Sequence, residues 1–131
     1  MNRDRLIETA LAVRERAYAP YSDFRVGAAI ETASGDVFAG CNVENASYGL
    51  TLCAERAAVC AAVAAGHREF VACAVATPRG AMPCGGCRQF LAEFADRLAV
   101  LIIDADSGQL VAETDLTALL PHAFHLRDGG R

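Results

Sequence analysis

The stretch Val71–Asp104, VACAVATPRGAMPCGGCRQFLAEFADRLAVLIID, decides the fold. It opens and closes with short, almost entirely apolar runs, at 71–77 and 100–104, which predict two buried strands. Between these runs, over 84–98, apolar residues follow one side of a predicted helix: Phe90, Leu91, Phe94 and Leu98. Buried strands that alternate with helices are typical of a sheet covered on both faces, so the chain is predicted to be α/β.

The rest of the chain extends this pattern on both sides. The first predicted element is a helix with Asn2 as its N-cap and an apolar stripe, over 6–17, that ends before Pro20. The others are strands over 24–32 and 36–43 joined by a turn at Ser34-Gly35, a helix over 51–65 closed by Gly66, a strand over 109–113, a short helix over 114–121 and a frayed tail at 128–131. The hairpin makes the sheet mixed. We therefore predict a three-layer α-β-α fold with a mixed five-stranded sheet.

Length and composition narrow the function classes. The 131 residues predict a single domain, 1–131, and 53% hydrophobic residues with a mean hydropathy of +0.23 exclude intrinsic disorder. The net charge is −4, lysine is absent and the arginines form no run, so we expect no nucleic-acid partner.

No segment resembles a membrane span or an export signal. Charges interrupt the N-terminal helix, and the longest apolar run, at 57–65, is shorter than the roughly 20 residues that cross a bilayer. We therefore expect a cytoplasmic protein without a membrane partner. In that compartment the six cysteines are interpreted as thiols, metal ligands or catalysts rather than as disulfides.

The predicted helix over 51–65 is apolar all round beyond Arg56. Such a helix needs burial on most sides, which is difficult in a chain of this size. Packing these helices together in a homo-oligomer would bury them. The alternative is that alanine is present only because it is a good helix former.

Two cysteine motifs carry the predicted chemistry: Cys-Ala-Glu-Arg at 53–56 and Pro-Cys-Gly-Gly-Cys-Arg-Gln at 83–89. Both begin predicted helices, where free N–H groups and the helix dipole stabilise thiolates. The spacing of Cys84 and Cys87 lets both sulfurs reach one metal ion, and Cys53 supplies a third from another helix. Three thiolates predict an open zinc site with water at the fourth position.

The residues that follow Cys53 suit a catalytic zinc. Glu55 is placed to take a proton from the bound water. Three thiolates leave zinc with a net charge of −1, and the guanidinium of Arg56 would offset that excess from outside the ligand shell.

The cysteines allow other interpretations. A Cys-x-x-Cys pair can also be a redox pair, half of a structural zinc site or two core thiols. A redox pair leaves Cys53 and Glu55 without a purpose, and a structural site needs a fourth ligand. Cys60 and Cys73 are interpreted as small core residues, and a histidine pair such as His122 and His125 near a C-terminus is more often exposed. The catalytic interpretation is therefore favoured.

Taken together, the motifs resemble the small homotetrameric cytidine deaminases that act on free nucleosides. The resemblance runs from Ala17 to Phe124 and adds three blocks to the two cysteine motifs: Tyr18-Ala19-Pro20-Tyr21-Ser22-x-Phe24-x-Val26-Gly27-Ala28-Ala29, Gly40-Cys41-Asn42-Val43-Glu44-Asn45-Ala46-Ser47-Tyr48-Gly49 and Leu119-Leu120-Pro121-x-x-Phe124. Deaminases that edit polynucleotides have His-x-Glu where this chain has Cys53-Ala54-Glu55.

The resemblance implies one Zn²⁺ per chain and hydrolysis of cytidine and 2′-deoxycytidine in pyrimidine salvage, with ammonia released. It implies that an activated water attacks C4 of cytosine while Glu55 carries its proton to N3 and then to the leaving amine. It further implies roles for six more residues: Phe24 beside the nucleoside, Asn42 and Glu44 on the ribose hydroxyls, backbone near Ala54 on the base, Phe124 reaching a neighbouring subunit's base, and Tyr48 at the subunit contacts. The sequence leaves open whether Arg88 and Gln89 take part directly.

Three rival functions stay open on the sequence. The nearest is a deaminase of the same fold that acts on a modified cytosine nucleoside of the blasticidin type. A non-catalytic zinc protein has no use for Glu55, and a thiol-disulfide oxidoreductase requires Cys84 and Cys87 to be redox-active.

Overall fold

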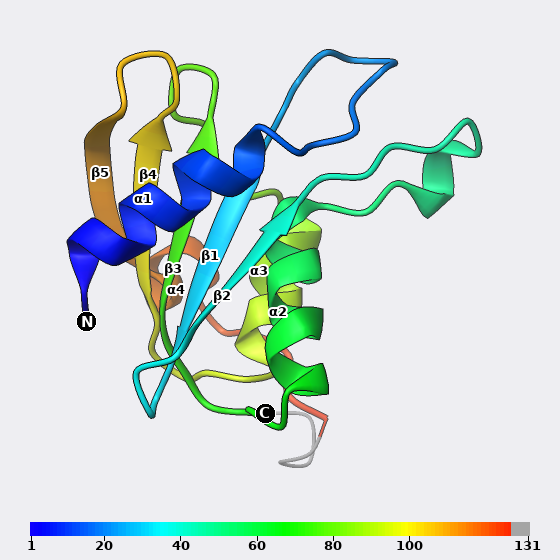
Figure 1. The fold of residues 1–131 in the computed structure, drawn as a ribbon. Helices are drawn as coiled ribbons and strands as arrows, with labels where there is room; N and C mark the ends of the chain where they lie inside the picture. The colour runs from blue at the N-terminus through cyan, green and yellow to red at the C-terminus, as the bar shows by residue number, and fades with distance from the viewer. Residues whose placement is uncertain (127–131) are drawn as a thin grey trace.

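The structure is a computed structural model that describes residues 1–126. The predicted tail at 128–131 lies outside the described residues. In chain order the elements are α1 (Arg3–Arg14), β1 (Gly27–Thr32), β2 (Val37–Cys41), the 3₁₀ helix η1 (Tyr48–Leu50), α2 (Ala54–Ala64), β3 (Phe70–Thr77), α3 (Gly85–Ala92), β4 (Ala99–Asp104), β5 (Gln109–Asp115) and α4 (Leu116–Leu119) (Figure 1).

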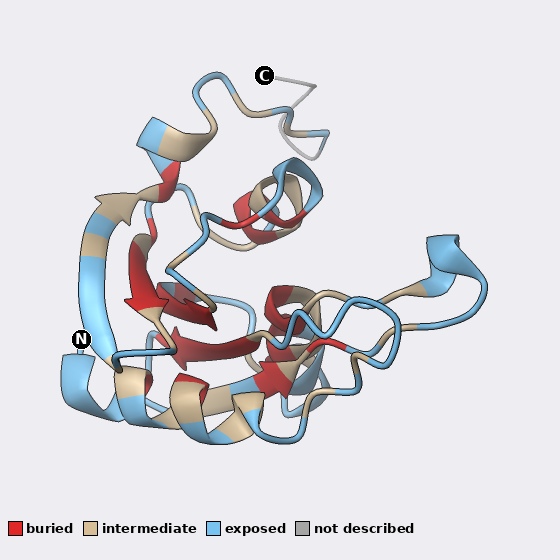
Figure 2. Cartoon of the chain, turned by 90° about the horizontal axis from the view of Figure 1, so that it is seen from above, coloured by how far each residue is buried: buried red, intermediate tan, exposed pale blue. Residues whose placement is uncertain are grey.

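The five strands form one mixed sheet in the order β2-β1-β3-β4-β5. β3 and β4 pair in parallel across α3, and the other neighbours pair antiparallel. Figure 2 shows α1 on one side of the buried strands and α2 and α3 on the other. The predicted three-layer fold with a mixed five-stranded sheet is therefore confirmed.

Alternation along the strands builds two cores of different character. On the face toward α2 and α3, β3 presents Cys73 and Val75, and β4 presents Val100 and Ile102. On the face toward α1, β3 presents only alanines, at positions 72, 74 and 76. They pack with residues of β1, β4 and α1: Ala29, Leu101, Ile103, Leu6 and Ala10. Small side chains let α1 lie close to the sheet.

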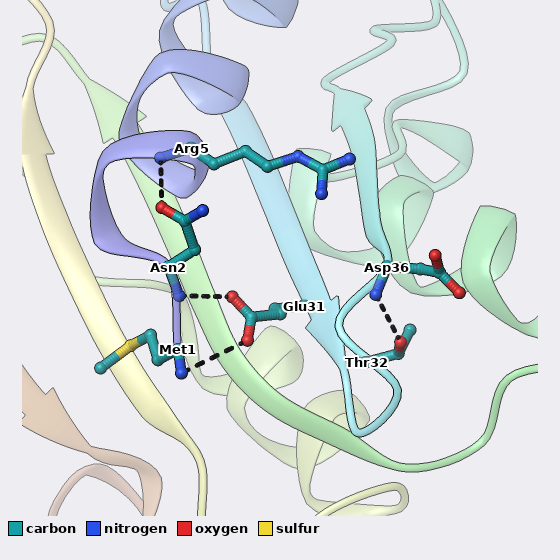
Figure 3. Close-up of polar contacts among 6 residues, drawn as sticks. All are labelled: Met1, Asn2, Arg5, Glu31, Thr32 and Asp36. Carbon is teal, nitrogen blue, oxygen red and sulfur yellow. Dashed lines mark hydrogen bonds and ion pairs between the residues drawn. The ribbon is translucent and has the colours of Figure 1, made fainter.

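The N-terminus of α1 is fastened to the end of β1 (Figure 3). The buried Glu31 carboxylate accepts the Asn2 backbone N–H at 2.8 Å, and it lies 3.6 Å from the Met1 ammonium. Asn2 caps the helix as predicted, because its side chain accepts the Arg5 N–H at 3.2 Å. A buried carboxylate thus has both a hydrogen-bond donor and a positive charge.

Gly40 lets the N-terminal half of α2 lie directly on β2. A Cβ atom at Gly40 would be 2.3 Å from the Ala58 nitrogen and 2.6 Å from the Ala54 oxygen, both backbone atoms of α2. The close approach matters because the first turn of α2 follows Cys53.

We expect Gly40→Ala to destabilise the protein by about 1–3 kcal/mol, the usual cost of overpacking. The added methyl must push α2 away from the sheet and shift the first turn of the helix. The free energy of unfolding from urea titration measures the change. Gly85→Ala is the control, because a Cβ there meets nothing within 4 Å. Equal stabilities of the two variants would contradict the close contact.

Several predicted boundaries are wrong. The helix expected over 84–98 ends at Ala92, because β4 starts at Ala99 parallel to β3 and the chain needs the intervening residues to return. Phe94 lies in the turn that follows and packs on Phe70 with ring centroids 5.5 Å apart.

The helix expected over 114–121 is a short helix, α4, because Thr114 and Asp115 instead extend β5 against β4. The helix expected over 51–65 starts at Ala54, because Leu52 pairs with Val43 in extended conformation.

The segment between β2 and α2 projects from the body of the molecule as an arm that carries η1 (Figures 1 and 2). Tyr48, at its tip, is 88% exposed, and Leu50 is also exposed.

Over residues 1–126, no helix combines the length and the apolar character that a bilayer crossing requires.

Candidate active site

The three predicted metal ligands meet at one point. Cys53 is the N-cap of α2 and Cys84 is the N-cap of α3, while Cys87 lies buried in the first turn of α3. The three Sγ atoms lie within 4.8 Å of one another, and those of Cys84 and Cys87 are 3.4 Å apart. Sulfurs on a tetrahedral zinc, at about 2.3 Å each, stand about 3.8 Å from one another. The cluster can therefore hold a metal ion.

The chemistry of the donors fits zinc. Three thiols at two helix N-termini are soft ligands in a position that favours their ionised form. Hydrogen bonding from the Cys87 thiol, with help from the Arg56 charge and against the effect of burial, lowers the pKa of Cys53 to about 6. The same bond and burial raise the pKa of Cys87. One thiol of the group thus ionises readily before any metal binds.

Arg56 lies beside the sulfurs, as predicted. Its Nη2 donates to the Cys84 Sγ at 3.9 Å, and its buried Nε has no hydrogen-bond partner among the described residues. Gly86 makes room for this guanidinium, because a Cβ at Gly86 would be 2.6 Å from Nη2. Gly86, in the second ligand motif, therefore leaves the space in which the positive charge of Arg56 lies against the cluster.

We expect Gly86→Ala to lower kcat/KM by about 10- to 100-fold, the range for changes just outside a metal's ligand shell. The methyl group must displace the Arg56 guanidinium and leave the thiolate charge uncompensated. Gly85→Ala, one residue away, is the matched control, because open space surrounds a Cβ there. Steady-state kinetics on both variants measure the difference. Equal loss in the two would show that helix geometry, rather than Arg56, is responsible.

Glu55, the third residue of the first cysteine motif, lies in the first turn of α2 and is only 5% exposed. Burial, and secondarily the charge of Cys53, raise the pKa of Glu55. A carboxyl group with a raised pKa accepts and releases a proton closer to neutral pH than a free glutamate does. Its position and its pKa both suit a group that transfers protons.

A cavity of about 190 Å³ opens beside the cysteines and Glu55. It is lined by Phe24, Val26, Asn42, Thr51, Leu52, Cys53, Ala54, Glu55, Val75, Thr77, Ala81, Met82 and Cys84. The cavity lies at the carboxyl end of β3, where open α/β sheets place their ligands. Larger cavities of about 490 and 470 Å³ near α4 and the end of α3 contain none of the three cysteines.

Asn42 also holds the backbone that leads into β1. Its Oδ1 accepts the Val26 N–H at 2.9 Å, and its Nδ2 donates to the Phe24 carbonyl at 2.8 Å. These bonds replace strand pairing, which explains why β1 starts at Gly27 rather than at the predicted Phe24. Asn42 thereby fixes the position of Phe24 at the cavity wall.

Glu44 faces a second cavity, of about 520 Å³, that shares Thr51 and Cys53 with the first. The Glu44 carboxylate accepts hydrogen bonds from the Ser22 hydroxyl and from the Tyr21 N–H at 2.9 Å. These bonds, led by that of Ser22, lower the pKa of Glu44. The resemblance implies that Asn42 and Glu44 bind the ribose hydroxyls. They follow the end of β2 and line adjoining cavities.

Phe124 lies apart from the first cavity in its own chain. It is 57% exposed and is absent from the residues that line that cavity. Tyr48 lines the cavity around Glu44 from the arm. Eight of the predicted residues line the two cavities: Phe24, Asn42, Glu44, Tyr48, Cys53, Ala54, Glu55 and Cys84. Arg56 and Cys87 both contact Cys84, and Phe124 lies outside both cavities.

Sequence reasoning missed Thr77, Ala81 and Met82. Thr77 is buried at the end of β3, and its hydroxyl accepts the Ala81 N–H at 2.5 Å. A polar residue that ends an apolar strand just before Pro78 was the available signal. Ala81 and Met82 carry no comparable signal, because only the fold of the 78–83 loop turns them toward the cavity.

Comparisons with known proteins agree with this geometry. Residues 1–103 match the family model described as the cytidine and deoxycytidylate deaminase zinc-binding region. The cytidine deaminase of Halalkalibacterium halodurans is 45% identical over 130 residues, covering 98% of each chain. The crystal structure of cytidine deaminase from Burkholderia pseudomallei is 50% identical, with a TM-score of 0.88 over 95% of this chain and 100% of that one. That from Mycobacterium tuberculosis is 41% identical, with a TM-score of 0.84 over 95% and 98%.

Proposed function

Since this chain belongs to the cytidine and deoxycytidylate deaminase family, it is a hydrolytic deaminase, and we propose that it converts the free nucleosides cytidine and 2′-deoxycytidine to uridine and 2′-deoxyuridine with one zinc ion per chain. One domain, 1–131, would carry the whole activity. The observation that carries the proposal is the cluster of three thiols, within 4.8 Å of one another, at the wall of a cavity that also contains the buried Glu55.

In this proposal Cys53, Cys84 and Cys87 hold the zinc. When bound, zinc lowers the pKa of a coordinated water from about 15.7 toward 7. Glu55 would accept one proton from the attacking water and pass it to N3 of cytosine, which makes C4 electron-poor enough for attack. Glu55 would then take the second proton, from the hydroxyl group that the water has added at C4, and pass it to the amine, which leaves as ammonia while C4 becomes a carbonyl. The raised pKa of Glu55 suits both directions of transfer.

The cavity walls supply binding and orientation. Phe24 offers an aromatic face for the nucleoside, and the backbone near Ala54 is close enough to the ligands to hold the base edge. Asn42 and Glu44 offer an amide and a carboxylate to the ribose hydroxyls. Cytosine would thus lie in the cavity with Glu55, with the sugar toward Glu44.

The charge of the cavities favours nucleosides over nucleotides. Among the described residues that line them, none is Arg or His, and Glu44 is an acceptor that would repel a phosphate. A 5′-phosphate needs positively charged or N–H donors to replace its hydration.

We further propose that the active unit is a homotetramer in which neighbours complete each site. The outer side of α2 exposes Cys60, Ala61 and Ala64, and the arm exposes Tyr48. Phe124, remote from its own cavity, would contact the base held by a neighbour. Dilution should therefore lower specific activity as subunits separate. Full activity from monomers would contradict this proposal.

We also propose that the protein acts in pyrimidine salvage in the cytoplasm. Conversion of cytidine to uridine serves pyrimidine salvage. The six cysteines, all free thiols in the structure, suit a reducing cytoplasm.

The test is ultraviolet absorbance of zinc-loaded protein mixed with cytidine, 2′-deoxycytidine or cytidine 5′-monophosphate. We expect rapid deamination of both nucleosides and slow or no deamination of the nucleotide. Turnover of the nucleotide alone would overturn the substrate assignment. No turnover of any of them, with zinc bound, would point to a modified cytosine nucleoside or to a structural metal.

A further inference from the structure

The two residues that follow Cys87 on α3 hold the C-terminal segment 119–124 through its main-chain carbonyls. Arg88 donates from Nη1 to the Leu119 oxygen at 2.9 Å and from Nε to the Pro83 oxygen at 2.9 Å. Gln89 donates from Nε2 to the Phe124 oxygen at 3.0 Å. The helix that carries Cys84 and Cys87 therefore also fixes both ends of this segment.

The hydrogen bond from Gln89 fixes the backbone that follows α4. Past Pro121 the backbone leaves α4 through His122, whose φ of +56° is a left-handed turn. In the described part of the chain, the bond from Gln89 is the hydrogen bond that ties the backbone of residues 122–126 to the rest of the protein. The Phe124 ring, in contrast, is largely exposed and outside its own cavity. An exposed aromatic ring is thus presented on a backbone fixed at one carbonyl.

We propose that Gln89 is a positioning residue that acts in trans: it holds Phe124 of its own subunit in place to contact the nucleoside bound by a neighbouring subunit. The inference rests on the proposed function, in which Phe124 reaches a neighbour. The hydrogen bond to the Phe124 carbonyl comes from α3, the ligand-bearing helix, of the subunit that supplies the ring. Each subunit would thus help to form the substrate pocket of its neighbour.

The expected signature is a rise in KM rather than a fall in kcat. Gln89→Leu removes the donor and keeps much of the side-chain volume, so Phe124 loses its fixed position while Glu55 and the cysteines keep theirs. KM for cytidine should rise about fivefold, the factor equivalent to one ordinary hydrogen bond. The kcat and the zinc content should stay unchanged. Gln109→Leu, the same substitution at an exposed position on β5, is the matched control and should leave KM unchanged.

Mixed oligomers separate action in trans from action within one subunit. Gln89→Leu subunits are co-expressed with an excess of Glu55→Gln subunits, which have an intact Gln89 but turn over at least about 100-fold more slowly. Each working site then receives Phe124 from a subunit with an intact clamp, and its KM should return to that of the unaltered protein. A KM that stays high would overturn the inference, because Gln89 would then act on its own subunit's site. If Gln89→Leu does not assemble, Gln89→Glu, of nearly equal size, replaces it.

A parallel mixture tests the contact of Phe124 with a neighbour separately from the role of Gln89. Phe124→Ala subunits mixed with Glu55→Gln subunits test only whether Phe124 serves a neighbour. Rescue there without rescue of Gln89→Leu would leave the shared active site standing and remove the role of Gln89. Rescue in neither mixture would overturn the neighbour contact itself, and the inference with it.

Discussion

Replacing Glu55 by glutamine is expected to lower kcat for cytidine by about 10²- to 10⁴-fold, the range that a positioned proton-transfer group supplies. Glutamine keeps the shape and the burial of the side chain, but it cannot accept the proton of the attacking water. Zinc content and oligomeric state should stay unchanged, because Glu55 lies outside the thiol cluster. Steady-state kinetics with parallel metal analysis measure both quantities.

Glu8→Gln, at an exposed position on α1, is the matched control and should leave kcat unchanged. A Glu55→Gln variant with near-normal turnover would show that another group moves the proton. A variant that loses its metal would show instead that the carboxylate supports the ligand cluster.

Replacing Cys87 by alanine is the second large effect that we expect. Removing one of three sulfurs leaves two ligands, so bound zinc should fall well below one per chain and kcat/KM should drop by more than about 100-fold, beyond the cost of an outer-shell change. Cys87 is buried at the start of α3, and unfolding should also shift to lower temperature as the link between α2 and α3 is lost.

Cys60→Ala provides the comparison for this variant, because Cys60 lies exposed on α2 and away from the cluster. It should retain one zinc per chain after dialysis. Equal zinc content in the two variants would contradict the ligand assignment of Cys87, and zinc loss in both would indicate that Cys60 also binds metal.

The ligand cluster could be predicted from sequence because its geometry is local. Cys84 and Cys87 are separated by one helical turn, and Cys53 begins a second helix, so helix N-termini and spacing bring the sulfurs within reach. The apolar strands at 71–77 and 100–104 likewise required burial on both faces, and they form the centre of the sheet.

Other features depend on contacts between distant segments. The end of α3 is set by the start of β4, which no local pattern in 84–98 encodes. Met82 reaches the cavity only through the path of its loop. The contacts of Gln89 and Phe124 join positions 35 residues apart, and a single sequence carries no signal for such a pair.

The proposed reaction is hydrolysis of the C4 amine of cytidine by a water activated at the Cys53–Cys84–Cys87 cluster. The most direct measurement is mass spectrometry of the product after incubation of zinc-loaded protein with cytidine in water labelled with heavy oxygen. We expect uridine with one labelled oxygen at C4 and one ammonia released for each uridine formed, and we expect removal of zinc to abolish both. Unlabelled uridine, or full turnover by zinc-free protein, would contradict the proposed reaction.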